Sequence, residues 1–160
     1  MRRSLRTHLP LAAALAVLAL AQPALAQKST LPQALTKVSI EPQIIAGQLR
    51  MAIGEEKRAL AGYEAARPSD SLTEYHQAAS NAYVLIRAAR SGMGQIGARK
   101  KVRDPVLDLV RSKVTQAWNR SRAPVDRISW GGPKDKYLEA SRRQLAETIG
   151  MLEQILAMWP

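Results

Sequence analysis

A single glutamate falls on the apolar face of the first predicted helix of this chain. Steps of three and four residues lead from Leu49 and Ile53 to Glu56, and then to Leu60 and Tyr63. A carboxyl group on an inward face must be paired, hydrogen-bonded or protonated. A buried carboxyl group with a raised pKa is a feature of many functional sites, so Glu56 is the first candidate for chemistry inside the protein.

Tyr83 is the candidate partner of Glu56. If the first two helices form a hairpin about residue 69, Glu56 lies level with Ala82 and Tyr83, and the tyrosine hydroxyl can pair with the carboxylate. Glu56 and Tyr83 would then form a buried polar site. The alternative is that Glu56 turns outward beside Glu55 and Lys57, and we favour this alternative.

The second chemical feature is an uneven distribution of charge. The chain holds 24 Lys and Arg against 13 Asp and Glu, for a formal charge of +11. Residues 27–86 and 128–160 are each balanced, with six basic and six acidic side chains in the first and four of each in the second. Residues 87–127 hold eleven basic and three acidic side chains, so they carry the net charge of everything beyond residue 26.

Such a basic stretch predicts a surface that attracts an anionic partner. The residues expected to form this surface are Arg99, Lys100, Lys101, Arg103, Arg111, Lys113, Arg120 and Arg122. The candidate partners are an envelope protein with an acidic face, lipid headgroups, lipopolysaccharide or an acidic glycan. Nucleic acid is not expected, because the segment has only one aromatic residue, Trp118, for stacking on bases and the chain carries a predicted export signal. The alternative is a solvated face that only confers solubility, and the sequence leaves both open.

A tryptophan precedes a turn rich in glycine and proline. Trp130, Gly131 and Gly132 lie in the predicted connection between the last two helices. Tryptophan is common at binding hot spots, and connections often carry function, so this is a possible interaction loop. The alternative is that Trp130 closes the end of the core.

Metal and cofactor chemistry finds little support in the sequence. The chain has no cysteine, and its only histidine beyond the first 26 residues is His76. One histidine without cysteine cannot form a transition-metal site unless carboxylates complete it. We therefore predict no metal, no cofactor and no catalytic residue.

The N-terminus has the three parts of a secretory signal. Arg2, Arg3 and Arg6 precede the apolar run 11–21, which is followed by the small-residue pattern at 24–26. The run is too short to span a bilayer, although an uncleaved anchor is the alternative. We expect cleavage after Ala26 and export to the periplasm by general secretion, with twin-arginine export as a second route. No transmembrane helix is expected in residues 27–160.

Helical spacing recurs in four segments after a short irregular leader at 27–40. The predicted helices run over about 42–66, from 71 to an end between 91 and 98, from 104 to before Pro124, and from about 133 to the C-terminus. The second has the clearest apolar face, formed by Leu72, Tyr75, Ala79, Ala82, Ile86, Ala89, Met93 and Ile96. The predicted fold is an all-α antiparallel four-helix bundle over residues 41–160.

Three functions fit these features. The first, which we favour, is a non-enzymatic accessory protein of the periplasm that uses its basic surface at about 87–127 to contact an anionic partner. The second is a binder of a small molecule or cofactor in the bundle core, which requires a buried polar group such as Glu56. The third is a small helical enzyme acting on an anionic substrate, which requires arginines that converge inside the bundle.

Overall fold

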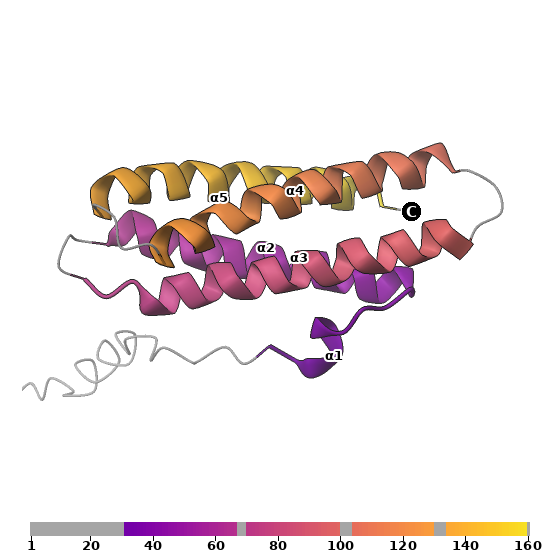
Figure 1. The fold of residues 1–160 in the computed structure, drawn as a ribbon, viewed down its shortest axis with the longest axis horizontal. Coiled ribbons are helices and arrows are strands. Elements are labelled where there is room, and N and C mark those ends of the chain that lie inside the picture. The colour runs from indigo at the N-terminus through magenta and orange to yellow at the C-terminus, as the bar shows by residue number, and fades with distance from the viewer. Residues whose placement is uncertain (1–30, 67–69, 100–103, 130–133, 160) are drawn as a thin grey trace, which may run out of the picture.

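The protein is all-helical, as predicted, over the part of the chain that its computed structural model describes. That part comprises residues 31–66, 70–99, 104–129 and 134–159, with side chains described outside 123–137, and it contains no strand. Its five helices are α1 (Gln33–Thr36), α2 (Pro42–Ala65), α3 (Thr73–Arg99), α4 (Pro105–Ser129) and α5 (Lys134–Ala157) (Figure 1). None of these helices has the length and apolar composition needed to cross a bilayer. The predicted signal peptide lies outside the described residues.

Local sequence signals set several helix ends. Pro42 opens α2, where a missing backbone N–H costs nothing. Asp104 caps α4, because its Oδ1 accepts hydrogen bonds from the backbone N–H groups of Val106 at 3.1 Å and Leu107 at 3.2 Å. α3 begins at Thr73, two residues after the predicted start at residue 71, and the Ser71 hydroxyl lies 3.1 Å from the Thr73 hydroxyl.

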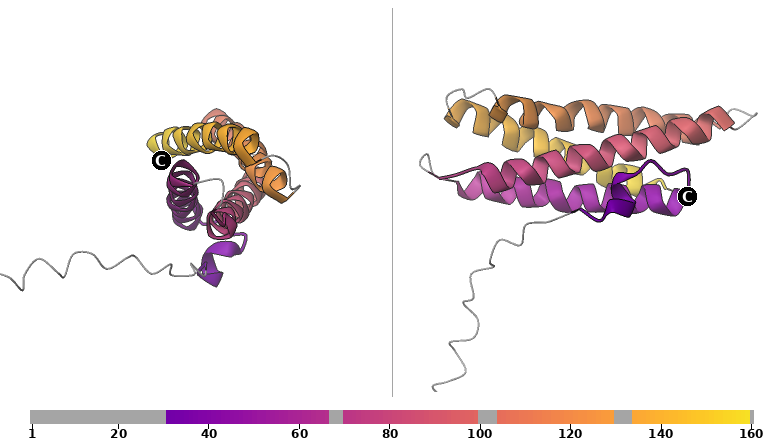
Figure 2. Two further views of the ribbon diagram at one scale, coloured as in Figure 1. Left: turned by 90° about the vertical axis from the view of Figure 1, so that its left-hand side faces the viewer. Right: turned by 60° about the horizontal axis from the view of Figure 1, so that its bottom comes forward.

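Each of the four long helices packs against two others. α2 contacts α3 and α5, and α4 contacts the same two helices, which an end-on view makes plain (Figure 2). Glu55 of α2 accepts a hydrogen bond from Asn81, whereas Gly62, seven residues later, lies against Tyr75. Contacts that rise along α2 therefore fall along α3, and these two helices run in opposite directions.

The buried apolar side chains form two clusters. The larger cluster spans α2 to α5 and includes Leu49, Ile53, Leu85, Ile86, Met93, Val114, Leu152 and Ile155. The smaller cluster consists of Ala59, Tyr63, Ala78, Ala79, Leu138 and Leu145. On α2 the break between them falls between Ile53 and Ala59, and on α5 it falls between Leu145 and Ile149. Glu56 of α2 and Thr148 of α5, which are both polar, therefore lie at the boundary between the two apolar clusters.

The segment before α2 is more ordered than the predicted irregular leader. It contains the short helix α1, and Gln48 fastens it to α2 by donating to the backbone oxygens of Leu35 at 3.0 Å and Lys37 at 2.8 Å. The backbone oxygen of Ser39 also approaches Gly92 of α3, at a point where a side chain would collide with it. The buried side-chain amide of Gln48 and the open space at Gly92 thus hold this segment against α2 and α3.

Two helices run further than predicted. α3 continues to Arg99 through three glycines that were expected to end it earlier. Two of those glycines, Gly92 and Gly97, lie against other groups, so their lack of a side chain serves packing. α4 continues through Pro124 to Ser129, which is possible because a proline removes only one backbone donor of a helix and bends it.

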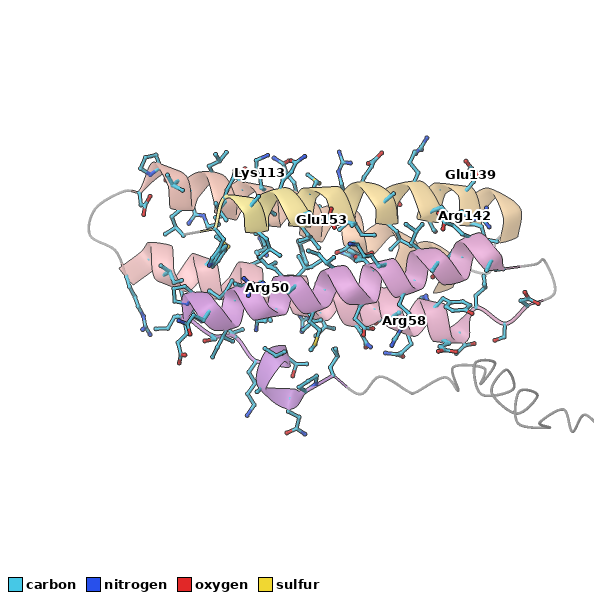
Figure 3. The ribbon with its side chains drawn as sticks, turned by 180° about the vertical axis from the view of Figure 1, so that it is seen from behind. Arg50, Arg58, Lys113, Glu139, Arg142 and Glu153 are labelled. Atoms are coloured by element: carbon cyan, nitrogen blue, oxygen red, sulfur yellow. The ribbon has the colours of Figure 1, made fainter. Side chains whose placement is uncertain are left out.

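An arginine of α5 closes the C-terminal end of α2. The side chain of Arg142 donates two hydrogen bonds to the backbone oxygen of Tyr63, and the bond from Nε is 2.8 Å long. That oxygen belongs to the last turn of α2, where no later N–H of the helix can reach it. Figure 3 shows Arg142 beside this end of α2. The contact joins α2 to α5 and places a positive charge at the negative end of a helix.

Candidate functional site

Glu56 is buried, contrary to the outward orientation that we favoured from the sequence. Its exposed fraction is 1%, and neither carboxyl oxygen has a hydrogen-bond partner among the described residues. The burial follows from helix geometry, because the Cα–Cβ direction at Glu56 is fixed by its place between Ile53 and Ala59 on the inward stripe. Glu55 is also buried, with 8% of it exposed, but it lies at the edge of the core, where Arg58 and Asn81 donate hydrogen bonds to it at 2.8 Å and 3.1 Å.

Tyr83 does not pair with Glu56. Its ring stacks on Trp118 of α4, with 5.8 Å between ring centroids, and it is only half-buried. Arg90 lies over the same tryptophan, 4.5 Å from the ring centroid. Asn81 bonds to Glu55 of α2 at 3.1 Å and Ala82 is buried, but at Tyr83 one further residue turns the side chain by about 100°. That rotation takes Tyr83 away from α2 and toward α4.

A buried hydroxyl on the same face of α2 as Glu56 is that of Tyr63, which was predicted only as a residue of the apolar face. Tyr63 follows Glu56 by seven residues on the same face, and its hydroxyl is buried without a partner among the described residues. Helical side chains lean toward the helix N-terminus, so the Tyr63 hydroxyl points back along the roughly 10 Å of helix axis that separates the two residues. The seven-residue spacing was the signal that could have identified it.

α5 contributes two more buried hydroxyls to this region. Ser141 lies between Leu138 and Leu145 on the face that packs against Tyr63, and its Oγ is also buried without a partner in the described part of the chain. Thr148 is fully buried and donates to the backbone oxygen of Gln144 at 2.8 Å, which leaves its oxygen able to accept. A carboxyl group and three hydroxyls therefore interrupt an otherwise apolar core between α2 and α5.

Burial controls the protonation of this group of side chains. Desolvation raises the pKa of Glu56 from 4.5 to about 8, because no positive charge offsets the loss of water. Desolvation also raises the pKa of Tyr63, and the Glu56 carboxylate adds to this effect. Glu56 is consequently a neutral acid at pH 7, able to donate one hydrogen bond and to accept others. The site can exchange a proton near neutral pH.

The basic residues of the middle stretch point outward. Arg87, Arg99, Arg111, Arg120 and Arg122 are exposed, while Arg90 and Lys113 are half-buried. Figure 3 shows Lys113 on the edge of the molecule that faces away from α2. Among the described residues, none of these side chains enters the core. The helical enzyme considered from the sequence would need arginines that converge inside the bundle, and these described arginines do not.

Some of these charges are neutralised within the molecule. Arg120 pairs with Glu147 of α5, and Arg111 pairs with Asp108 at 3.5 Å. Arg99 and Lys113 form no ion pair with any described residue. Positive charge therefore stays open to a partner at Arg99 and Lys113, on the helices that meet at this end of the molecule, and also at the exposed Arg87 earlier in α3.

This end of the molecule protrudes. α3 and α4 extend past the adjacent ends of α2 and α5, as two different views agree (Figures 1 and 2). Because α2 and α5 end before the first turns of α4 (Figure 1), two large apolar side chains are left open there, with exposed fractions of 55% for Val106 and 51% for Leu109. Arg111 lies across α3 at Gly97, where an added Cβ would be 3.1 Å from its guanidinium.

Several predicted site residues fall outside the described part of the chain. Lys100, Lys101 and Arg103 belong to the connection between α3 and α4, and by sequence they add three positive charges to it. The predicted interaction loop of Trp130, Gly131 and Gly132 also lies outside the described residues.

Comparison of the chain with models of protein families, with curated proteins and with solved structures found no match.

Proposed function

We propose that this protein is a non-enzymatic accessory protein of the periplasm that contacts an anionic component of the cell envelope through the basic surface of α3 and α4. In this proposal the first 26 residues direct export and are removed after Ala26, and the four long helices form an antiparallel four-helix bundle. The bundle acts as a rigid support that presents the basic surface.

The observation that carries the proposal is the direction of the basic side chains. Every described lysine and arginine between residues 87 and 122 reaches the surface, and only Asp104 and Asp108 are acidic there. Asp104 caps α4 and Asp108 pairs with Arg111, so both acids already have partners in the protein. A field of one sign at one end of the molecule favours encounter with a polyanion and weakens as salt rises.

The proposal is tested by cross-linking in the native envelope. The tagged protein should yield one abundant cross-linked component at low salt and less of it at moderate salt. The charge reversal of Arg99→Glu with Lys113→Glu should reduce the yield at least tenfold. Arg50→Glu with Arg143→Glu is the matched control, since both arginines are exposed on other helices. Equal loss in both double variants, or no cross-linked component at all, would contradict the proposal.

A second function is favoured by a separate observation, the buried polar atoms of Glu56, Tyr63 and Ser141. Buried polar groups in proteins are nearly always hydrogen-bonded, and an isolated one costs about 1–3 kcal/mol. A small polar molecule held between α2 and α5 would satisfy all three. This makes the protein a carrier or sensor of such a molecule, with Glu56 as the group that recognises it.

Native mass spectrometry of protein recovered from the periplasm tests this second function. We expect an added mass that is present in the wild type and absent in Glu56→Leu, a change that removes both oxygens. Glu55→Gln is the control, because Glu55 is a neighbour that bonds to Arg58 at the rim. A wild-type mass that matches residues 27–160 alone would remove this function from consideration.

A further inference from the structure

The α3–α4 tip combines exposed apolar and basic side chains, and we define it by Arg99, Val106, Leu109, Arg111 and Lys113. We infer that this tip docks on the surface of a lipid bilayer that contains anionic headgroups. The inference rests on the proposed function and names its partner. It is carried by the protrusion of the tip together with the chemistry of these five side chains (Figure 1).

The apolar part of the tip lies on one stripe of α4. Val106 and Leu109 are three residues apart, and Lys113 follows four residues later, so the three occupy one face of the helix. More than half of each apolar residue is exposed. Val110 follows Val106 by one turn on the same side of α4, and it is buried, as is Val114 one turn later. Val106 is therefore exposed because it precedes the part of α4 that the core covers, and Leu109 lies beside it on the open side of the helix.

The charged part of the tip surrounds this apolar pair. Arg99 ends α3, Lys113 continues the exposed stripe, and Arg111 lies against Gly97 of α3. Asp104 and Asp108 are engaged in the cap of α4 and in the pair with Arg111. A partner must consequently offer negative charge on its surface and apolar material just beneath it.

An anionic bilayer meets both demands, and a protein partner meets them less well. A stable protein interface buries about 800 Å² on each side, usually around an aromatic or arginine anchor in a pocket. The tip is convex and offers two aliphatic side chains, so it cannot form such an interface alone. Peripheral attachment to a membrane needs only shallow apolar insertion together with attraction between basic side chains and anionic headgroups.

These two contributions give different expectations for binding. Each basic side chain near an anionic surface contributes about 1 kcal/mol, which is about a fivefold change in partitioning. Arg99→Gln with Lys113→Gln should therefore weaken binding roughly twentyfold at low salt. Val106→Ser with Leu109→Asn should weaken it about tenfold or more at any salt concentration, because apolar insertion is not screened.

The test is cosedimentation with lipid vesicles. Protein recovered from the periplasm, with its N-terminus sequenced to establish cleavage, is mixed with vesicles of phosphatidylcholine alone or of phosphatidylcholine and phosphatidylglycerol in equal amounts. We expect binding to the mixed vesicles only. Arg50→Gln with Arg143→Gln matches the loss of charge away from the tip, and Val38→Ser removes an apolar side chain that is 47% exposed on the leader. Both controls should bind as the wild type does.

The outcomes separate this inference from the function on which it rests. Absence of binding to the mixed vesicles, or equal loss in tip variants and controls, overturns the docking on lipid. If cross-linking in the envelope still depends on Arg99 and Lys113, the proposed function survives with a protein, glycan or lipopolysaccharide as partner. If the cross-linking fails as well, both are wrong. Circular dichroism of each variant establishes that a loss of binding is not a loss of fold.

Discussion

The stability of this protein should fall as pH rises from about 4.5 to about 8, by about 1.4 kcal/mol for each pH unit from Glu56 alone. The reason is that the folded protein binds the Glu56 proton more tightly than the unfolded chain does, since folding places the carboxyl group in an apolar core. The stabilisation from this group is complete below its unfolded pKa of 4.5 and is lost as pH passes through its folded pKa of about 8.

Replacing Glu56 by glutamine isolates this effect from every other titrating group. The amide has the size of the neutral acid and cannot ionise, so Glu56→Gln should match the wild type near pH 4.5. At pH 7 it should be more stable by about 3 kcal/mol, because the wild type has by then lost that much. Urea unfolding of the two proteins at a series of pH values measures the difference. All other ionisable groups are shared and cancel.

The charged groups around Glu56 explain why no other side chain should mimic this behaviour. Glu55 is held by Arg58 and Asn81, and Lys57 pairs with Glu153 of α5 at 2.8 Å. Glu55→Gln is thus the matched control, and at pH 7 it should lower stability where Glu56→Gln raises it, because it weakens the contacts with Arg58 and Asn81. If the Glu56→Gln and wild-type curves run parallel, Glu56 ionises in the folded protein as it does in water, and the buried acid is not neutral.

The apolar spacing of the sequence was sufficient to predict four long helices and most of the core. The face of the second predicted helix coincides with the core of α3, where Ala79, Ala82, Ile86, Ala89 and Met93 are all buried. Such a prediction succeeds because repeated burial on one stripe is the main determinant of an amphipathic helix. The predicted start of the third helix at residue 104 agrees with the structure for a different reason, since the cap that Asp104 forms depends only on local hydrogen bonding.

The candidate site was harder to predict, because it depends on the direction in which each side chain points as well as on its position along the helix axis. The sequence predicted that Glu56 lies level with Ala82 if the first two helices form a hairpin, yet it could not show that Glu56 faces the core without a hydrogen-bond partner among the described residues. Nor could it show that Tyr83 turns to Trp118 of α4, because that requires the position of a third helix. Only the structure brings Ser141 from the far end of the chain to the region of Tyr63.

The protruding tip was also beyond sequence analysis. Val106 comes one turn before the buried Val110, so spacing within α4 alone does not distinguish Val106 from a core residue. The exposure of Val106 and Leu109 follows from the relative lengths of helices, since the first turns of α4 extend past α2 and α5 (Figures 1 and 2). A pattern within one helix cannot report where its neighbours end.

The glycines of α3 provide the other large effect that we expect. Gly92→Ala should destabilise the protein by about 2–3 kcal/mol, because its Cβ would be 2.0 Å from the backbone oxygen of Ser39 and 3.2 Å from Ile45. A backbone oxygen cannot rotate away as a side chain can. The clash is relieved most easily if the segment that carries Ser39 moves away from α3. That movement also weakens the hydrogen bond from Gln48 to the backbone of Lys37.

Gly94 provides the control, because nothing lies within 4 Å of a Cβ added there. Gly94→Ala should stabilise the protein by up to about 1 kcal/mol, since alanine is the better helix former. Two glycine-to-alanine changes, two residues apart in one helix, should therefore have opposite signs. Urea unfolding measures both, and limited proteolysis should cut the leader of Gly92→Ala faster than that of the wild type. Stabilisation by both changes would mean that the leader does not rest on α3 and that these glycines are only weak points of the helix.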